Sequence, residues 1–325
     1  MKRYSLYFTG IRKVEVREED PGKAGPGRLL VETRASAISP GTESLIFRGE
    51  APSEMTVDSA LCALPGKFEY PFKYGYACAG TVKGAPAELK KWEGLDVVCL
   101  NPHETCFLAR PEELMPVPRG IPPEKACLLP FMETAVNLAL DGAPLLGEEV
   151  AIFGQGLIGL LLTAVIARFP LARLFTLDPL PGRRAESLRL GATLSSHPAE
   201  CCIAAADLVY ELSGRPETLG QAVSCTGFGG RIVIGSWYGT RDGYSGFGGE
   251  FHRKRIQIIS SQVSSLAPAL TGRWSTQRRI REAWKMLKST DTDRLITHKF
   301  PFRDAQKAYG ALDDPGGAIG VILTY

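Results

Sequence analysis

The sequence predicts an α/β fold in which a β-rich segment precedes a doubly wound parallel sheet. Residues 1–120 consist mostly of short strand patterns separated by turns rich in Pro and Gly, such as Gly25-Pro26-Gly27. From Ile121 onward, apolar strand patterns alternate with helical patterns, which is typical of a parallel sheet. One of these strands, Val150-Ala151-Ile152-Phe153, runs directly into a glycine-rich turn.

The elements of the β-rich segment are short. The stretch 50–74 breaks their pattern as a long irregular insertion, rich in Pro and aromatic residues, of the kind that often forms a lid or a substrate wall. The expected strands are residues 3–8, 13–17, 29–38, 79–83, 96–100, 105–109 and 113–116.

The second segment is expected to bind its ligand where the parallel strands end, at their carboxyl ends. This places Asp178, Ser213-Gly214, Gly235-Ser236-Trp237-Tyr238 and Ser260-Ser261-Gln262 at one edge of the sheet. The expected strands are 150–153, 174–177, 207–212, 231–235, 256–261, 296–300 and 318–323, and the expected helices are 123–140, 160–167, 182–190, 276–288 and 302–312.

The glycine-rich turn has the spacing G-x-G-x-x-G over Gly154-Gln155-Gly156-Leu157-Ile158-Gly159. Gly154 allows a tight strand-to-helix turn, Gly156 lets the backbone approach a pyrophosphate, and Gly159 lets the helix pack closely on the sheet. The start of the following helix favours an anion. We therefore expect these six residues to bind a dinucleotide, although a glycine-rich turn that binds nothing has the same pattern.

The choice of nucleotide depends on Asp178, which ends the next strand roughly 20 residues after the last glycine, where a ribose-binding carboxylate is expected. A carboxylate there accepts hydrogen bonds from the ribose hydroxyls and repels a 2′-phosphate. Arg183 and Arg184 follow closely and would instead suit that phosphate. NAD(H) is therefore the expected cofactor, with NADP(H) as the second choice.

Composition excludes several other classes of protein. The chain has 325 residues, 44% of them hydrophobic and 22% charged, with a net charge of +3, which is too small to indicate nucleic acid or a membrane surface as partner. Met1-Lys2-Arg3-Tyr4 has no apolar signal-peptide core, so a cytoplasmic location is expected. The cysteines form no C-x-x-C motif and are interpreted as small buried hydrophobic residues: Cys62, Cys78, Cys99, Cys106, Cys127, Cys201, Cys202 and Cys225.

Several motifs together resemble the medium-chain dehydrogenase/reductase superfamily: Gly25-Pro26-Gly27, the segments 37–43 and 74–82, the glycine fingerprint and the strand 230–235. The resemblance implies a GroES-like β-barrel domain of residues 1–120 and 291–325. It also implies a Rossmann domain of residues 121–290. Members often dimerise through a sheet edge, so we expect a homodimer joined through residues 256–261 and 246–249.

A narrower resemblance rests on the loop 38–43 and the ending 314–323, which look like the branch that contains the bacteriochlorophyllide hydroxyethyl dehydrogenase. It implies hydride transfer between a small-molecule alcohol and ketone. The segments 70–76 and 101–105 differ from that pigment enzyme, so the substrate is not identified.

The sequence departs from zinc-dependent members of the superfamily. Where these place a Cys, the chain has Ser39-Pro40, and where they place a His-Glu pair it has Tyr76-Ala77. Glu133 remains near the third ligand position, and one carboxylate cannot hold zinc by itself. We therefore expect no metal.

Without zinc, another group must handle the proton of a substrate hydroxyl. The candidates are Tyr76, which stands at a former ligand position, and His103, in a polar turn that resembles one lining the substrate cleft. Each candidate has a competing interpretation. Tyr76 could merely fill the space that a metal would occupy, and His103 could have a structural role or be exposed to solvent. Further candidates are Ser39 and Glu133 for catalysis, Thr42, Glu43 and Tyr238 for substrate, and Ser213, Gly235 and Trp237 for the cofactor.

The function expected from these residues is zinc-independent, NAD(H)-dependent interconversion of a secondary alcohol and a ketone. One alternative is an NADPH-dependent enone or quinone reductase, which Asp178 disfavours. The other is a nucleotide-binding protein without catalysis, which the polar candidates in the first domain disfavour.

Overall fold

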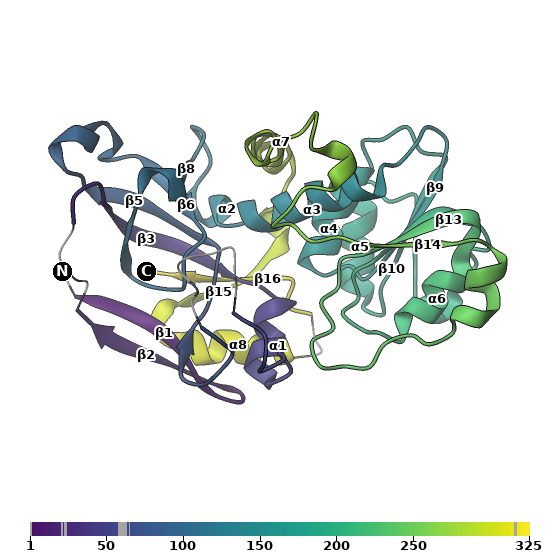
Figure 1. Ribbon diagram of the computed structural model, residues 1–325, viewed down its shortest axis with the longest axis horizontal. Coiled ribbons are helices and arrows are strands. Elements are labelled where there is room, and N and C mark those ends of the chain that lie inside the picture. Colours follow the sequence, from purple (N-terminus) through teal and green to yellow (C-terminus); the bar gives the residue numbers. More distant parts are fainter. Residues whose placement is uncertain (1, 21, 23–24, 58–63, 65, 315–316) are drawn as a thin grey trace. The chain divides into compact units, whose positions relative to one another are not determined.

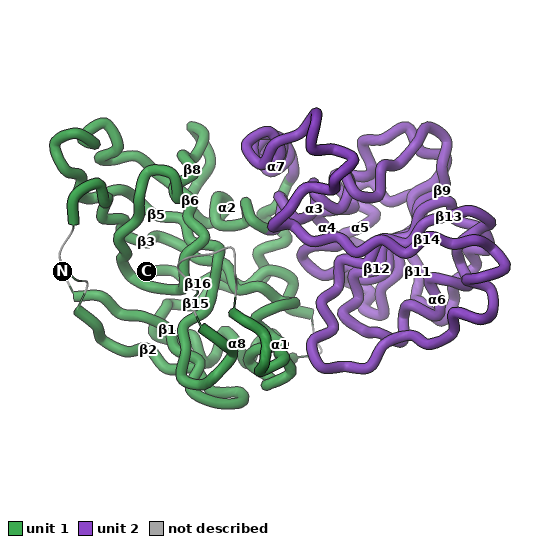
Figure 2. Tube along the Cα trace, viewed as in Figure 1, with its two compact units in different colours: residues 1–130, 291–325 green, residues 131–290 purple. Residues whose placement is uncertain are grey.

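The chain forms two compact units in the computed structural model, which describes residues 2–20, 22, 25–57, 64, 66–314 and 317–325. Unit 1 consists of Met1–Pro130 and Asp291–Tyr325, and unit 2 of Phe131–Thr290 (Figure 2). The change from unit 1 to unit 2 thus falls ten residues beyond the expected boundary at 120. None of the helices in the described ranges is long and apolar enough to cross a membrane.

Unit 1 is a β-rich domain built on two sheets (Figure 1). The larger is a seven-stranded sheet of order β15-β16-β3-β5-β6-β8, with β7 paired to β3, so the C-terminal strands complete it. The smaller has the order β2-β1-β4. The strands are β1 (Arg3–Gly10), β2 (Lys13–Glu19), β3 (Leu29–Ile38), β4 (Phe72–Lys73), β5 (Cys78–Gly84), β6 (Asp96–Cys99), β7 (Cys106–Ala109), β8 (Leu114–Pro116), β15 (Ile296–Pro301) and β16 (Gly320–Thr324).

The core of unit 1 comes from the alternating inward residues of these strands. Val31 and Val82 are fully buried on β3 and β5, and Val97 on β6 meets them from the next strand. This alternation is why the sequence pattern located most of the strands. The helices of unit 1 are α1 (Thr42–Arg48), α2 (Pro123–Ala126) and α8 (Ala305–Asp313).

Two parts of unit 1 differ from the sequence expectations. Residues 38–43, expected as a loop, run into helix α1 at Thr42, and this helix buries Leu45, Ile46 and Phe47. The insertion 50–74 contributes the short strand β4, while its residues 58–63 and 65 lie outside the described part, as do Cys62 and residues 315–316 of the ending 314–323.

Unit 2 is a six-stranded parallel sheet of order β11-β10-β9-β12-β13-β14, which is the strand order of a Rossmann fold (Figure 1). The order reverses beside β9, so the carboxyl ends of β9 and β12 flank the point where such folds bind nucleotides. The strands are β9 (Glu149–Phe153), β10 (Arg173–Leu177), β11 (Leu194–Ser196), β12 (Ala206–Glu211), β13 (Thr226–Ile234) and β14 (Gln257–Ser260). The helices are α3 (Leu129–Gly142), which begins in unit 1, α4 (Leu157–Ile166), α5 (Pro181–Arg189), α6 (Thr218–Cys225) and α7 (Thr276–Ser289).

Four features differ from the expectations for unit 2 and its first helix. The strand β11 and helix α6 were not expected, because both are short and lack a clear apolar period. The expected helix 123–140 is divided into α2 and α3. Residues 246–249, expected to supply a sheet edge, belong largely to a helical turn over Phe247–Phe251, so β14 alone forms that edge.

The turn from β9 into α4 requires glycine at two positions for different reasons. Gly154 has a φ of 89°, in the left-handed region, and a Cβ there would lie 2.5 Å from the Leu212 carbonyl oxygen. At Gly159 the backbone is ordinary helix, but a Cβ would lie 1.9 Å from the carbonyl oxygen of Gly154. Helix α4 can therefore approach the sheet only because position 159 has no side chain.

Gly159→Ala is expected to destabilise unit 2 by about 2–3 kcal/mol, because backbone atoms must move to admit the methyl group. The matched control is Gly182→Ala in the exposed first turn of α5, where a Cβ meets nothing within 4 Å. That change should alter the free energy of unfolding by at most about 1 kcal/mol. Urea unfolding followed by circular dichroism measures both, and equal stability of the two variants would contradict the close approach at Gly159.

Candidate functional site

The N-terminus of α4 presents a positively polarised backbone to an open space. Helix α4 starts at Leu157 after Gly156, and the amide groups of Leu157 and Ile158 belong to its first turn. A Cβ at Gly156 would meet nothing nearer than the Arg183 guanidinium, 4.0 Å away. A helix N-terminus, a bare glycine and a guanidinium therefore converge where the fingerprint is expected to hold a diphosphate.

Asp178 lies directly beside this turn and is almost completely buried. Its Oδ2 accepts a hydrogen bond of 2.7 Å from the backbone N–H of Gln155, and its Oδ1 accepts one of 2.8 Å from Leu180. Because a carboxylate has about four acceptor positions, each oxygen keeps capacity for a ligand hydroxyl. An Arg183 Nη atom lies 3.9 Å from Oδ2, so the positive charge of this guanidinium, which could bind a phosphate, lies next to the Asp178 carboxylate.

The side chain of Gln155 is part of the protein interior. Its amide oxygen accepts a hydrogen bond from the Thr163 hydroxyl at 2.9 Å, and its amide nitrogen donates to the Gly154 carbonyl at 3.2 Å. Gln155 therefore supports the turn, and only its backbone is oriented by Asp178.

A second group of expected residues lies at the carboxyl ends of β12 and β13. The backbone N–H of Ser213 donates to Glu211 at 2.8 Å, and the Tyr238 hydroxyl donates to the other oxygen of the same carboxylate at 2.5 Å. Burial, followed by the charge of Glu211, raises the pKa of Tyr238 well above its ordinary value. At Gly235 a Cβ would lie 2.5 Å from a Leu212 methyl carbon, so this position needs glycine for packing. Trp237, half-buried, lies next to Tyr238 in the same loop.

Glu211 is the residue that sequence reasoning missed here. It is fully buried at the end of β12 and holds the turn at Ser213 and the loop at Tyr238 together. A carboxylate that ends an apolar strand was the available signal, because such a group is almost never fully buried without partners.

In unit 1, the expected residues Ser39 and Tyr76 are in direct contact. The Tyr76 hydroxyl donates to Ser39 Oγ at 2.7 Å, and the backbone N–H of Thr42 donates to the same oxygen at 3.3 Å. Since Ser39 Oγ accepts from both, its own proton is available for a third partner. Tyr76 is half-buried, so the pair joins a buried hydroxyl to a more exposed one.

Glu43 is the centre of a buried network beneath this pair. One of its oxygens accepts the Ser39 backbone N–H at 2.8 Å, and the other lies 3.0 Å from His103 Nε2 and accepts the Tyr309 hydroxyl. Glu43 and His103 are both fully buried, and His103 Nδ1 lies 2.7 Å from Ser36 Oγ. Both ring nitrogens of His103 are thus engaged, one by Ser36 and the other by Glu43.

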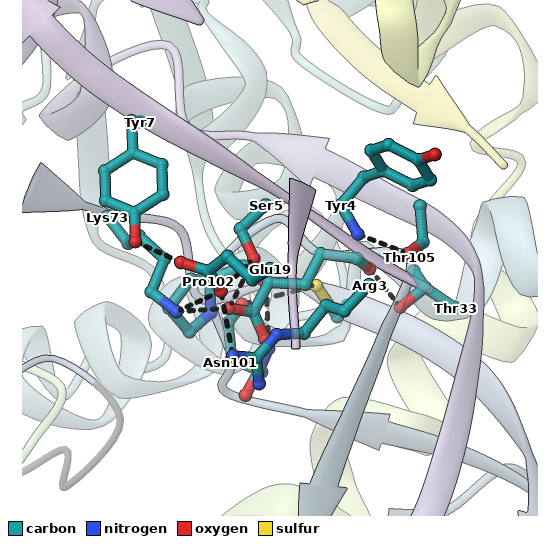
Figure 3. Close-up of polar contacts among 12 residues, drawn as sticks. Arg3, Tyr4, Ser5, Tyr7, Glu19, Thr33, Lys73, Asn101, Pro102 and Thr105 are labelled. Atoms are coloured by element: carbon teal, nitrogen blue, oxygen red, sulfur yellow. Dashed lines mark hydrogen bonds and ion pairs between the residues drawn. The ribbon is translucent and has the colours of Figure 1, made fainter. Parts of the chain in front are cut away.

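The turn that carries His103 is anchored by a charged cluster, shown in Figure 3. Buried Glu104 accepts from Lys73 at 2.6 Å and from the Ser5 hydroxyl at 3.0 Å, and Lys73 lies 3.3 Å from Glu19. Burial raises the pKa of Glu19, but the hydrogen bonds from Tyr7 and Ser5 and nearby positive charges outweigh it and lower that pKa to about 2. The cluster joins β1, β2 and β4 to the His103 turn.

Glu133, the remaining catalytic candidate, belongs to a structural ion pair within unit 2. The Arg279 guanidinium on α7 lies 2.9 Å from its carboxylate and donates a further hydrogen bond to Asn137 at 2.6 Å. Arg279 is itself buried, so it needs this partner. Burial raises the pKa of Glu133, with the charge of Arg279 opposing that effect.

The residues that the resemblance places at zinc-ligand positions do not fit a zinc ion. Ser39 and Tyr76 offer neutral hydroxyls that bond to each other, whereas zinc sites use thiolates, imidazoles and carboxylates. His103 and Glu43 face each other within the interior. Over the described ranges of the chain, no three His, Cys, Asp or Glu side chains form a potential ligand set.

Comparisons with known proteins give relatives by sequence over part of the chain. No family model matches it. L-threonine 3-dehydrogenase from Caldanaerobacter subterraneus is 26% identical over 206 residues, which cover 58% of this chain and 55% of that protein. Sorbitol dehydrogenase 1 from Saccharomyces cerevisiae is 26% identical over 232 residues, covering 66% of this chain and 61% of the relative. The chain therefore matches little more than half the length of these relatives.

Solved structures match the whole chain and confirm the fold class predicted from the sequence. L-idonate 5-dehydrogenase from Escherichia coli superposes with a TM-score of 0.81 at 16% identity, covering 100% of this chain and 99% of that one. An alcohol dehydrogenase from Escherichia coli, solved with NADH, gives a TM-score of 0.80 at 16% identity, with coverage of 100% and 99%. The fold is a GroES-like β-domain combined with a Rossmann domain, as in these dehydrogenases.

The low pKa of Glu19 predicts a contribution to stability that disappears in acid. This contribution is fully present above the ordinary carboxyl pKa of 4.5 and is lost as the pH falls towards about 2, because the folded state binds its proton less readily. Glu19→Gln should therefore lose less of its free energy of unfolding over this range than the wild type. Urea unfolding at several pH values measures the slope, with exposed Glu88→Gln as control. A Glu19→Gln slope identical to that of the wild type would contradict the prediction.

Proposed function

We propose that this chain is a zinc-independent, NAD(H)-dependent oxidoreductase that interconverts a secondary alcohol and a ketone by hydride transfer. The observation that carries the proposal is the buried carboxylate of Asp178 at the end of β10, bonded to the fingerprint turn. The similarity to threonine and sorbitol dehydrogenases supports an alcohol as substrate.

Unit 2 supplies the cofactor site in this proposal. The first turn of α4 and Arg183 would hold the diphosphate, Asp178 the adenosine ribose, and the loops at Ser213 and Trp237 the nicotinamide end. A nicotinamide held there would supply the hydride-transfer chemistry. Asp178 favours NAD(H), while Arg183 at 3.9 Å from it keeps NADP(H) as the second choice.

Unit 1 supplies the groups that move the substrate proton. The Ser39 hydroxyl can donate its proton to a substrate oxygen while it keeps the hydrogen bonds that it accepts from Tyr76 and Thr42. Glu43 fixes the Ser39 backbone, and His103 and Tyr309 complete the hydrogen bonds of the Glu43 carboxylate. Ser39 and Tyr76 are therefore the proposed catalytic residues, with Glu43 and His103 as positioning residues.

The same residues support the proposed metal independence. A neutral Ser–Tyr pair polarises a carbonyl less strongly than a Lewis acid, so the pair must act by hydrogen bonding and proton transfer. The resemblance to the bacteriochlorophyllide branch, the cytoplasmic location and the homodimer joined at the β14 edge stay predictions.

Asp178→Asn is expected to weaken NADH binding about 10- to 100-fold, because a charge-assisted pair of hydrogen bonds to the ribose becomes a neutral one. NADPH binding should weaken less, since the change also removes repulsion of the 2′-phosphate. Titration of nicotinamide fluorescence measures both affinities, with Glu200→Gln on the same unit as control. An equal loss of affinity for the two cofactors, or no loss, would show that Asp178 does not bind the ribose.

Tyr76→Phe should lower kcat for secondary alcohols at least about tenfold with little change in KM, because Ser39 loses its hydroxyl partner. Absorbance at 340 nm with a panel of secondary alcohols and chelator-treated enzyme measures the effect. The matched control is Tyr4→Phe in unit 1, because the Tyr4 hydroxyl donates to the exposed carboxylate of Glu18. If Tyr76→Phe keeps the wild-type turnover, the Tyr76 hydroxyl has no catalytic role and the side chain only fills space. Turnover of enones alone, with NADPH, would favour the reductase alternative.

A further inference from the structure

Two of the three cysteines of unit 2 are in sulfur-to-sulfur contact. The Sγ atoms of Cys201 and Cys225 lie 3.1 Å apart, although the residues are 24 positions apart in the sequence. A disulfide bond is about 2.05 Å long, so the two sulfur atoms need to approach by only about 1 Å to form one. Cys78 and Cys127 of unit 1 instead direct their sulfur atoms to backbone carbonyl oxygens.

The two thiols differ in accessibility. Cys225 ends helix α6 and is buried in the core of unit 2, beside Val223 and Ile256. Cys201 is half-buried, packs against that core and follows the short helix Pro198–Glu200. Its surroundings, residues 201–205, are irregular backbone before β12, which permits the small shift that a bond requires.

The electrostatics assign an order to the two thiols. Burial and the neighbouring Cys201 raise the pKa of Cys225 to about 12, so this thiol carries little thiolate near neutral pH. Cys201 is the more exposed of the two and is therefore the thiol that an oxidant in solution reaches first.

We propose that Cys201 and Cys225 form a reversible oxidation site that closes to a disulfide on exposure to hydrogen peroxide. The Cys201 thiolate attacks one peroxide oxygen and breaks the O–O bond, which leaves Cys201 as a sulfenic acid, and the displaced hydroxide takes up a proton from solvent and leaves as water. The Cys225 sulfur then attacks the Cys201 sulfur, forms the S–S bond and releases a second water. Two electrons pass from the two thiols to the peroxide, and a dithiol reductant reverses the step.

The disulfide would tie together the two ends of the segment that contains β12 and α6. This segment includes Glu211, which holds the loops at the carboxyl edge of the sheet. Closing the segment restricts the unfolded chain, so oxidised unit 2 should unfold at a temperature higher by about 5 °C or more.

The test treats the full-length chain with hydrogen peroxide, blocks the remaining thiols with iodoacetamide and digests the protein with a glutamate-specific protease. Cleavage after Glu211 and Glu217 separates Cys225 from Cys201 and Cys202, so a cross-link appears as a peptide pair that dithiothreitol divides. The wild type should give this pair together with the higher unfolding midpoint. Exposed Cys202 is the matched control: Cys202→Ser should retain the cross-link, and half-buried Cys201→Ser should abolish it.

The opposite results overturn the proposal. Peroxide-treated wild type with no cross-link, and with Cys201 recovered as sulfinic acid or as unmodified thiol, would show that the pair does not close. A cross-link lost in Cys202→Ser and kept in Cys201→Ser would assign the site to the neighbouring cysteine. Circular dichroism confirms that each variant is folded, and Cys225→Ala checks the buried partner independently.

Discussion

The hydrogen bond between the Asp178 carboxylate and the backbone N–H of Gln155 is the contact on which the nucleotide end of the molecule depends. It joins the end of β10 to the fingerprint turn after β9, and the second oxygen of Asp178 fixes the start of the next loop at Leu180. The backbone of Asp178 also donates to the Ser196 carbonyl at the end of β11 at 3.3 Å. The carboxylate and the backbone of this one residue thus connect the ends of three neighbouring strands. Because its remaining lone pairs are still available, the group that builds the turn is also suited to bind ribose.

Unit 1 uses a buried carboxylate in a comparable way. Glu43 lies on α1 and bonds to the backbone of Ser39, to His103 and to Tyr309. A fully buried carboxylate is costly unless each oxygen has donors, and here every partner comes from a different element of the unit. This network fixes the backbone of Ser39, which supports the proton-transfer role that we propose for the Ser39–Tyr76 pair.

Much of the fold could be predicted from the sequence, because strands such as β3 and β9 carry a strong apolar pattern and the fingerprint needs glycine for steric reasons that hold in any chain. The predicted proximity of Asp178 to the fingerprint also followed from spacing alone. Helix α1 was missed because Ser39-Pro40-Gly41 resembles a loop, and the burial of Leu45 to Phe47 decides its structure only in three dimensions.

The candidate site was harder to predict from the sequence, for a related reason. Glu43 and His103 are 60 residues apart, and only the pairing of β3 with its neighbours brings them together. Glu133 was expected at the catalytic centre, but its partner Arg279 lies 146 positions later in the sequence. Cys201 and Cys225 were interpreted as ordinary buried residues, because no local pattern reveals that their sulfur atoms meet. Contacts between residues so far apart in the sequence depend on how the strands pair, and a periodic sequence pattern does not determine that register.

The central claim is that unit 2 binds NADH without the help of a metal. Calorimetric titration of chelator-treated protein with NADH tests it most directly, with ADP-ribose as a second ligand that lacks the nicotinamide. The account predicts one saturable NADH site per chain, for which ADP-ribose competes, since both present a diphosphate to α4 and a ribose to Asp178. Absence of binding, or binding that appears only after zinc is added back, would contradict it.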